Sequence, residues 1–393
     1  SLQRALELVW AENPQVREAE KAIEAAGFEV TGSYGGFLPS VTISNSTGRD
    51  GLSSVQASLP LWNGGLTLAQ IDGSKAREVA ARATLDRVRL TLGEQTLEAF
   101  YNLAQAQEQL RQWSRYLTAL ERLRVSISNR ANEGVATQSE VQTALSRMRQ
   151  AEVGQEAARL LLLSSRNELS KLLNVSPQTV QWSDDTEAGL ADLQSVDTET
   201  LLSRHPDVLL ASAQVVEQDA VVKQARSRFY PEVALQYRTY YSGEAFDRTA
   251  DAPQLVVQYQ VGNGFTAYQQ VSAEQSRADS ARARLDVVKR EVQSRLSATR
   301  EQLLSSSRQF QLQKQASDSS QSLVESFLRQ YQVGRRSWVE VLNAQREAHE
   351  NELGSISSRK AYLLGAHQLA LQMLAWDSLL RERGSSADTA AAP

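Results

Sequence analysis

An internal duplication is the feature that most constrains the fold of this chain. Pro14 recurs as Pro206 with an offset of 192 residues, and the turn at Gly134 recurs at Gly334 with an offset of 200. Matching turn and break residues at matching intervals indicate that each half repeats one series of elements. Each copy is expected to contain a helix, two short strands, a very long helix, a tight turn and a returning helix.

The two copies define the predicted domain organisation. The first repeat is expected over 1–192 and the second over 193–383, with a disordered tail over 384–393. In the first repeat we predict a helix over 2–33 interrupted near Pro14, strands at about 38–47 and 53–62, a long helix over 66–131, a return helix over 138–173 and a connector. In the second we predict a helix over 199–228, strands at about 230–241 and 254–262, a long helix over 265–332 and a return helix over 338–382.

Composition favours long helices and excludes several functions. Gly and Pro number only 20 and 8 among 393 residues, and the net charge is −4 with both signs interspersed, so nucleic acid is not an expected partner. The chain has no cysteine, which excludes disulfides and thiol catalysis. The longest aliphatic run, Leu160 to Leu163, is far shorter than a membrane-spanning helix. A membrane crossing would therefore have to use strands.

The strand segments alternate between apolar and polar residues. Val233, Leu235 and Tyr237 alternate with Ala234 and Gln236. Runs of about 9–12 residues suit tilted transmembrane strands, but four strands cannot close a barrel. If these strands lie in a membrane, several chains must share one barrel, because open sheet edges are not tolerated in lipid. The alternative is an ordinary surface hairpin packed on helices.

The proline-free segment over 66–131 predicts a helix of about 100 Å at ~1.5 Å per residue. Leu103, Leu110 and Leu117 recur every seven residues, which is typical of a coiled coil. The second copy matches in length, although Ser317 interrupts its heptad. The fold class predicted from these residues is mainly α with a small β part, built on long coiled-coil hairpins.

With these features the chain resembles the TolC family of outer-membrane channel proteins over about 2–382. The resemblance implies a homotrimer with a twelve-stranded β-barrel in outer-membrane lipid, four strands from each chain, and an α-barrel through the periplasm of a Gram-negative bacterium. It also implies a periplasmic adaptor protein and an inner-membrane ABC or RND transporter as partners. The residues that carry it are Asn13-Pro14, His205-Pro206, Phe37-Leu38-Pro39, Phe229-Tyr230-Pro231, Leu59-Pro60-Leu61-Trp62-Asn63-Gly64-Gly65 and the segment from Tyr331 to Ala344.

The resemblance places a gate at the two hairpin turns. A threefold axis would turn Glu340 into a ring of carboxylates whose mutual repulsion raises their pKa. The alternative is that Glu340 is solvated or pairs with Arg336, four residues earlier. Asn343 departs from the family pattern, which often has a second acid there. The positions that match the family's gate are Ser139, Glu140, Tyr331, Arg336, Glu340 and Asn343.

Two further groups of residues are expected to contact an adaptor protein and the membrane interface. Trp338 is expected to pack between helices near the gate. Trp62 and Phe229 could instead pack at the junction between strands and helices. The turns expected to meet the adaptor are formed by Gly134, Val135, Ala136, Thr137, Gly334, Arg335 and Ser337. The aromatic residues expected to form a membrane-interface girdle are Trp62, Phe229, Tyr230, Tyr237, Tyr240 and Tyr241.

The sequence predicts a passive duct and not an enzyme, with no cofactor and no metal. His205, His349 and His367 are scattered, and no catalytic motif is present. The short loops over 45–51 and 242–252 favour type I protein secretion over multidrug efflux. The alternatives are a soluble coiled-coil scaffold and an enzyme with a helical-bundle core.

Overall fold

The structure is a computed structural model that describes residues 1–45, 53–175, 177, 179–182, 198–241, 248–250, 252–259 and 266–374. Several predicted features fall outside these residues. They are most of the loops between the strands, most of the connector, the last residues of the strand expected over 254–262, the end of the helix expected over 338–382 and the tail over 384–393.

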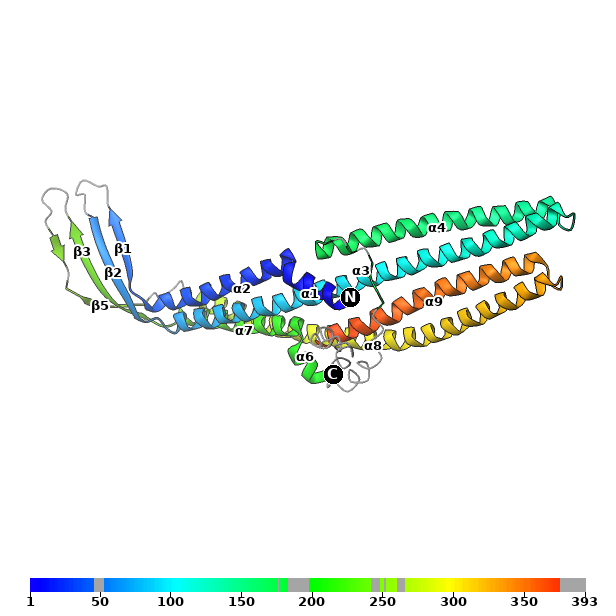
Figure 1. Ribbon diagram of the computed structural model, residues 1–393. Coiled ribbons are helices and arrows are strands. Elements are labelled where there is room, and N and C mark those ends of the chain that lie inside the picture. Colours follow the sequence, from blue (N-terminus) through cyan, green and yellow to red (C-terminus); the bar gives the residue numbers. More distant parts are fainter. Residues whose placement is uncertain are drawn as a thin grey trace, which may run out of the picture. The chain divides into compact units, whose positions relative to one another are not determined.

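Helices make up most of the described chain (Figure 1). The long helices α3 and α8 each contain 67 residues, so the duplication extends to their length. Among the described helices, none combines the length and the apolar character that a membrane crossing requires. The helices are α1 (Leu2–Glu12), α2 (Pro14–Ser33), the 3-10 helix η1 (Tyr34–Phe37), α3 (Leu66–Asn132), α4 (Gln138–Leu173), α6 (Thr198–Arg204), α7 (Pro206–Ser227), α8 (Thr266–Gln332) and α9 (Trp338–Gln372).

Both repeats break their first helix immediately before a proline. Asn13 has ψ 131° and His205 has ψ 131°, which is extended backbone. A proline ring clashes with a helical conformation of the preceding residue, so the chain leaves the helix for one residue. The side chain of His205 then caps α7 by accepting the N–H of Asp207 at 3.3 Å. The single helix predicted over 199–228 is therefore wrong, because the rule that applied at Pro14 applies equally at Pro206.

The strands form one antiparallel sheet. In it β1 (Ser40–Asn45) pairs with β2 (Ser53–Trp62), and β2 pairs with β3 (Glu232–Tyr241). The short strands β4 (Arg248–Ala250) and β5 (Gln254–Gln258) pair with opposite ends of β3. They occupy one position in the sheet, so each copy of the repeat supplies two strand positions, as the sequence predicted. The second copy differs in that its return strand is divided, and the first part, β4, lies within the loop predicted over 242–252, so that loop prediction is wrong at these residues.

The sheet register separates apolar from polar side chains. Val41 lies opposite Ala57, and Ala57 lies opposite Tyr237 on the next strand. Because opposed residues in an antiparallel pair share a face, these side chains form one apolar face. On the other face, Arg238 donates through Nε to Gln56 at 3.0 Å. The apolar face is largely exposed in the single chain, with Val41, Ile43, Leu255 and Val257 among its exposed members.

The chain divides into two compact units. We call them the sheet unit (17–88 and 202–293) and the hairpin unit (1–16, 89–201 and 294–393). Each unit contains segments of both repeats, so the boundary at 192 is a boundary between copies in sequence and not between compact units. Figure 1 shows the α3–α4 and α8–α9 pairs of the hairpin unit as antiparallel hairpins with short turns.

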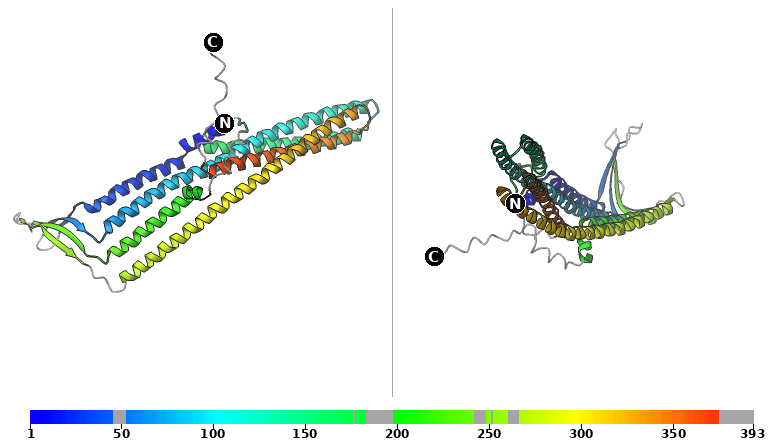
Figure 2. Two further views of the ribbon diagram at one scale, coloured as in Figure 1. Left: turned by 90° about the horizontal axis from the view of Figure 1, so that it is seen from below. Right: turned by 90° about the vertical axis from the view of Figure 1, so that its right-hand side faces the viewer.

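In the sheet unit, the helices α2, α3, α7 and α8 lie side by side in one layer (Figure 2). Ion pairs join neighbours in that order. Arg77 of α3 lies 3.3 Å from both Glu29 of α2 and Glu217 of α7. Arg282 of α8 lies 2.5 Å from Asp219 of α7. All these groups are at least one-third exposed, so each pair is expected to contribute little stability, about 0–1 kcal/mol.

Candidate functional site

The two hairpin turns have the same backbone geometry. Both turn glycines have φ +75°, a left-handed conformation that glycine adopts without a steric penalty. In the first turn, Gly134 N donates to the Ala131 carbonyl at 3.0 Å and Val135 N donates to the Arg130 carbonyl at 2.8 Å. This pair of bonds is the Schellman motif, which ends a helix. In the second turn the same bonds, at 3.0 and 2.9 Å, run from Gly334 to Tyr331 and from Arg335 to Gln330.

Both returning helices begin with a capping box. Thr137 Oγ1 accepts the N–H of Glu140 at 3.3 Å, and a Glu140 carboxylate oxygen accepts the N–H of Thr137 at 2.6 Å. Ser337 and Glu340 repeat this arrangement at 3.3 and 3.0 Å. The two glutamates that the sequence placed at a gate therefore also hold the first turn of α4 and of α9.

The second oxygen of Glu140 joins the two hairpins. The Trp338 indole N–H of α9 donates to Glu140 Oε1 of α4 at 2.6 Å. Trp338 also packs against the apolar core behind the turns, as the sequence predicted. Since the bond connects residues 198 positions apart, it ties the start of one returning helix to the start of the other.

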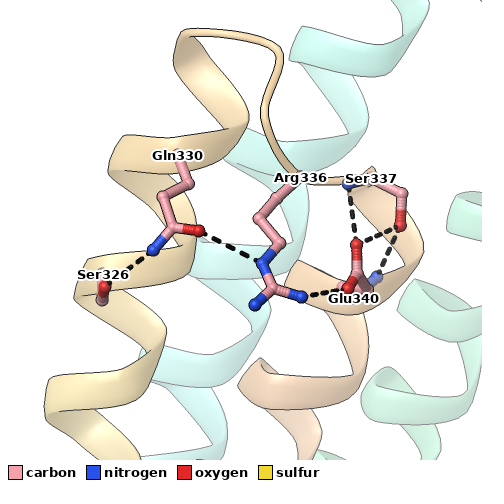
Figure 3. Close-up of polar contacts among 5 residues, drawn as sticks. All are labelled: Ser326, Gln330, Arg336, Ser337 and Glu340. Carbon is pink, nitrogen blue, oxygen red and sulfur yellow. Dashed lines mark hydrogen bonds and ion pairs between the residues drawn. The ribbon is translucent and has the colours of Figure 1, made fainter.

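The second oxygen of Glu340 is bound within its own hairpin (Figure 3). It accepts from Arg336, so the expected alternative of an ion pair four residues apart is present. Arg336 Nε also donates to Gln330 of α8 at 3.1 Å, and Gln330 donates to Ser326 at 3.1 Å. The Arg336 guanidinium lies 4.4 Å from the centre of the Phe327 ring. Arg336 thereby connects both arms of the second hairpin across its turn.

Both capping carboxylates are held in the charged form. The pKa of Glu140 is lowered mainly by the backbone N–H of Thr137 and then by the indole N–H. The pKa of Glu340 is lowered mainly by the backbone N–H of Ser337 and then by the guanidinium. Hydrogen bonds to a carboxylate favour its ionised form, so both glutamate side chains are negatively charged at neutral pH. The rise in pKa expected for a ring of Glu340 side chains remains a prediction about the assembled trimer.

An apolar core behind the turns packs the two hairpins together. Tyr331 is buried in it, and the guanidinium of Arg130 lies 5.1 Å from the centre of the Tyr331 ring. The core draws residues from all four helices of the two hairpins: Tyr116, Leu120, Leu123, Ile127, Ala144, Ala151, Tyr331, Val341 and Leu342.

The other predicted positions at the turns are exposed. Ser139 and Asn343 lie on the surface, so both are available to a neighbouring chain. Val135 and Val333 are exposed apolar residues beside the turn glycines. The residues predicted to meet an adaptor are exposed apart from the half-buried Ala136: Gly134, Val135, Thr137, Gly334, Arg335 and Ser337.

The aromatic residues predicted for a membrane girdle lie on and beside the sheet. Trp62 and Tyr230 pack edge to face with ring centres 5.8 Å apart, and both rings remain partly exposed. Phe229 and Tyr237 are also exposed. The Trp62–Tyr230 contact brings a strand end against the end of α7, so packing at the junction is present. The side chains of Tyr240 and Tyr241 lie outside the described part of the structure.

Sequence reasoning missed the residues that connect the arms. Gln330 and Phe327 were not proposed for the gate, and Trp338 was expected only to pack. Gln330 lies six residues before Arg336 with a turn between them, so no helical or strand periodicity links the two residues in the sequence. Among the described residues, no group of His, Asp and Glu could hold a metal ion.

An amphipathic four-position sheet, paired long hairpins and equivalent turns define the class of outer-membrane helical-barrel channel subunits. The family model for outer membrane efflux proteins matches residues 5–175 and 198–371, and the chain belongs to this family. It is therefore a channel protein of the outer membrane of Gram-negative bacteria that extends into the periplasm. The matched family consists of channels and not enzymes.

Solved structures of the same fold cover nearly the whole chain. A membrane protein from Pseudomonas aeruginosa is 19% identical, with TM-score 0.82, 95% of this chain covered and 93% of that one. CusC is 16% identical, with TM-score 0.81 and coverage of 95% and 91%. The CmeC outer membrane channel of Campylobacter jejuni is 15% identical, with TM-score 0.81 and coverage of 95% and 85%. No curated protein sequence gives a significant match.

Proposed function

We propose that this chain forms the outer-membrane exit duct of a tripartite export system, as a homotrimer. The observation that carries the proposal is the exposed apolar face of the sheet, whose outer positions β1 and β4/β5 each pair with one neighbour among the described strands. A bilayer tolerates such a sheet only if other chains pair with its edges. Three chains with four strand positions each would give the twelve-stranded barrel that the resemblance implies. A soluble scaffold would leave the same face in water.

We propose that the hairpin turns form the periplasmic entrance and that three contacts restrain it. The Trp338–Glu140 bond would hold the second hairpin against the first. The contacts of Arg336 with Glu340 and Gln330 would hold the second hairpin closed on itself. Opening would require at least one of these to break. Ser139 and Asn343 would face neighbouring chains at the entrance.

An adaptor protein of the periplasm is the proposed partner at the turns. Glycine lacks a side chain, so Gly134 and Gly334 permit another backbone to approach closely. Val135 and Val333 offer exposed apolar contacts beside them, and Arg335 adds a positive charge. An inner-membrane ABC or RND transporter would supply the cargo through that adaptor.

Conductance in planar lipid bilayers tests the duct and its gate together. The purified trimer is expected to form ion-conducting pores. Trp338→Phe keeps an aromatic ring but removes the N–H donor to Glu140, and Arg336→Ala removes the contacts across the second turn. Each variant is expected to raise single-channel conductance or open probability several-fold.

Arg149→Ala is the matched control, because Arg149 forms an exposed ion pair with Glu152 on α4, away from the turns. It is expected to conduct like the unmodified protein. Absence of any pore would overturn the duct. Pores whose conductance is the same in all three variants would overturn the gate assignment and leave the duct standing.

Type I protein secretion is the cargo class we propose over multidrug efflux, on the shortness of the segments that join β1 to β2 and β3 to β4. Long external loops would restrict the mouth of a barrel, and a protein cargo needs a wide one. Deletion of the gene from its host separates the two classes. Loss of a secreted protein with unchanged drug susceptibility is expected, and increased drug susceptibility with an unchanged set of secreted proteins would refute the protein cargo.

A further inference from the structure

A buried histidine lies between the two hairpins of each chain without a hydrogen bond. His349 of α9 is 4% exposed and stacks on Tyr116 of α3, with ring centres 4.2 Å apart and an interplanar angle of 8°. The Trp113 ring meets its edge at 4.2 Å and 65°. Among the described residues, neither ring nitrogen of His349 has a hydrogen-bond partner. The imidazole is therefore packed as an apolar ring.

We call the rings of His349, Tyr116 and Trp113 the His349 sandwich, and three helices hold it in place. Trp113 and Tyr116 are three residues apart on α3 and so share a face of that helix. Gly154 of α4 lies so close to Trp113 that a Cβ there would be 2.3 Å from the indole Cη2. The indole therefore has no room to move toward α4. Because α3 and α4 belong to the first hairpin and α9 to the second, the ring stack is a contact between hairpins.

The same positions in the second copy do not build such a stack. An offset of 200 maps Trp113 onto Gln313, Tyr116 onto Ala316 and Gly154 onto Gly354. The sandwich is therefore a feature of one hairpin pair only and not a by-product of the duplication.

We propose that the His349 sandwich is an acid-sensitive joint between the two hairpins, which protonation of the imidazole opens. An imidazolium there would gain a cation–π contact with the face of Tyr116, but both its N–H groups would be buried without a hydrogen bond, which costs more. If the hairpins separate at this level, both N–H groups reach water. Acid therefore favours the separated arrangement.

Burial, and none of the charged groups around the rings, lowers the pKa of His349 to about 4, from its ordinary value of 6.5. Arg147 of α4 and Arg346 and Glu350 of α9 act on Tyr116, whose pKa is raised mainly by burial. Toward α8, Glu352 of α9 accepts a hydrogen bond from Ser317 at 2.5 Å.

The sign and size of the effect follow from proton linkage. The joined state binds the proton at about pH 4 and the separated state at about 6.5, so the separated state binds more protons as pH falls. Between pH 7 and pH 5 the ratio of separated to joined hairpins is expected to rise about 20-fold. Ordinary carboxylates remain largely ionised over this range, which isolates the histidine.

Distances between spin labels test the proposal in the full-length trimer. The chain has no cysteine, so Thr118→Cys on α3 and Glu347→Cys on α9, both exposed positions, give one label on each hairpin. Diluting labelled chains in unlabelled ones leaves about one labelled protomer per trimer. The ratio of the longer to the shorter distance is expected to rise about 20-fold from pH 7 to pH 5.

His349→Phe keeps an apolar ring but cannot titrate, and it is expected to abolish this change. His349→Gln serves the same purpose if the phenylalanine variant does not assemble. His367→Gln is the matched control, because His367 is buried beside Tyr101 of α3 but its Nδ1 has contacts at 3.0 Å with the Tyr101 hydroxyl and 2.8 Å with the Leu363 carbonyl. It is expected to keep the response.

A pH response that survives in both His349 variants, or that disappears in His367→Gln, would overturn the proposal. So would an unmodified protein whose distances do not change. These measurements need no pore activity, so their failure is distinguishable from failure of the proposed duct.

Discussion

At the scale of single residues, the duplication places glycines where a returning helix crosses a long one, but their surroundings differ. Gly154 faces the rigid indole of Trp113, which is fixed in turn by His349. Gly354 faces the amide end of Gln313, with a nearest approach of 2.6 Å for a Cβ. A rigid ring that also packs on His349 cannot yield, whereas the flexible Gln313 side chain can, at the cost of its hydrogen bond to the Asn351 carbonyl.

Gly154→Ala is therefore expected to destabilise the protein by about 1–3 kcal/mol, as overpacking of a filled core does. Gly354→Ala is expected to be neutral or stabilising by up to about 1 kcal/mol, because alanine is the better helix former. Thermal unfolding followed by circular dichroism measures both. Equal melting temperatures for the two variants would contradict the packing argument.

At the scale of elements, the returning helices depend on their N-terminal caps. Thr137 and Ser337 each accept the N–H of the glutamate three residues later, and each glutamate returns a bond to the cap. The arrangement satisfies backbone donors that the first turn of a helix would otherwise leave unbonded. Each cap also fixes the glutamate that contacts Trp338 or Arg336.

Thr137→Val or Ser337→Ala is expected to cost about 0.5–2 kcal/mol in stability, since each removes an N-cap acceptor. Thr143→Ala is the control, because Thr143 only bonds the carbonyl of Ser139 within α4. Thermal melts at neutral pH compare the three. A control that loses as much stability as the cap variants would refute the assignment.

The caps also predict a pH dependence. The folded pKa of Glu140 and of Glu340 lies below the ordinary value of 4.5. Their bonds therefore stabilise the fold fully above that value, and the contribution is lost as pH falls through the lowered folded pKa. The stability difference between Glu340→Gln and the unmodified protein is expected to shrink below about pH 4.5, because the glutamine carries no carboxylate to titrate.

At the scale of the whole molecule, the two faces of the sheet determine where the protein can reside. Ile43 is 75% exposed and lies on the apolar face, opposite Val55. Thr42, the preceding residue, points to the polar face, opposite Gln56. If the apolar face meets lipid in the trimer, adjacent positions of β1 must differ sharply in their tolerance of charge.

Ile43→Lys is expected to reduce assembly strongly, because a lysine on the lipid face costs about 2–4 kcal/mol near the bilayer midplane. Thr42→Lys is expected to assemble nearly as well as the unmodified protein. The yield of heat-modifiable trimer extracted from outer membranes measures both. Equal yields, or a protein that stays monodisperse without detergent, would contradict a membrane-embedded sheet.

Much of the architecture followed from the sequence because it depends on local order. The offset between Pro14 and Pro206 gave the repeat, and the glycines at 134 and 334 marked turns that the structure places there. Alternation identified the strand positions and the apolar face. The helix break at His205 was missed because the rule that the residue before a proline leaves the helix was applied at Pro14 and not at Pro206.

The contacts at the candidate site were decided by tertiary structure. Periodicity places Trp338 and Glu140 near their turns, but their bond depends on how one hairpin is rotated against the other. The same holds for Gln330 and Arg336 across a turn, and for His349 between Trp113 and Tyr116. The sequence alone thus determined the elements and their repetition, because propensity and spacing act within a few turns of chain. Only the tertiary structure decided which side chains meet, because the rotation and register of packed helices depend on all their contacts together.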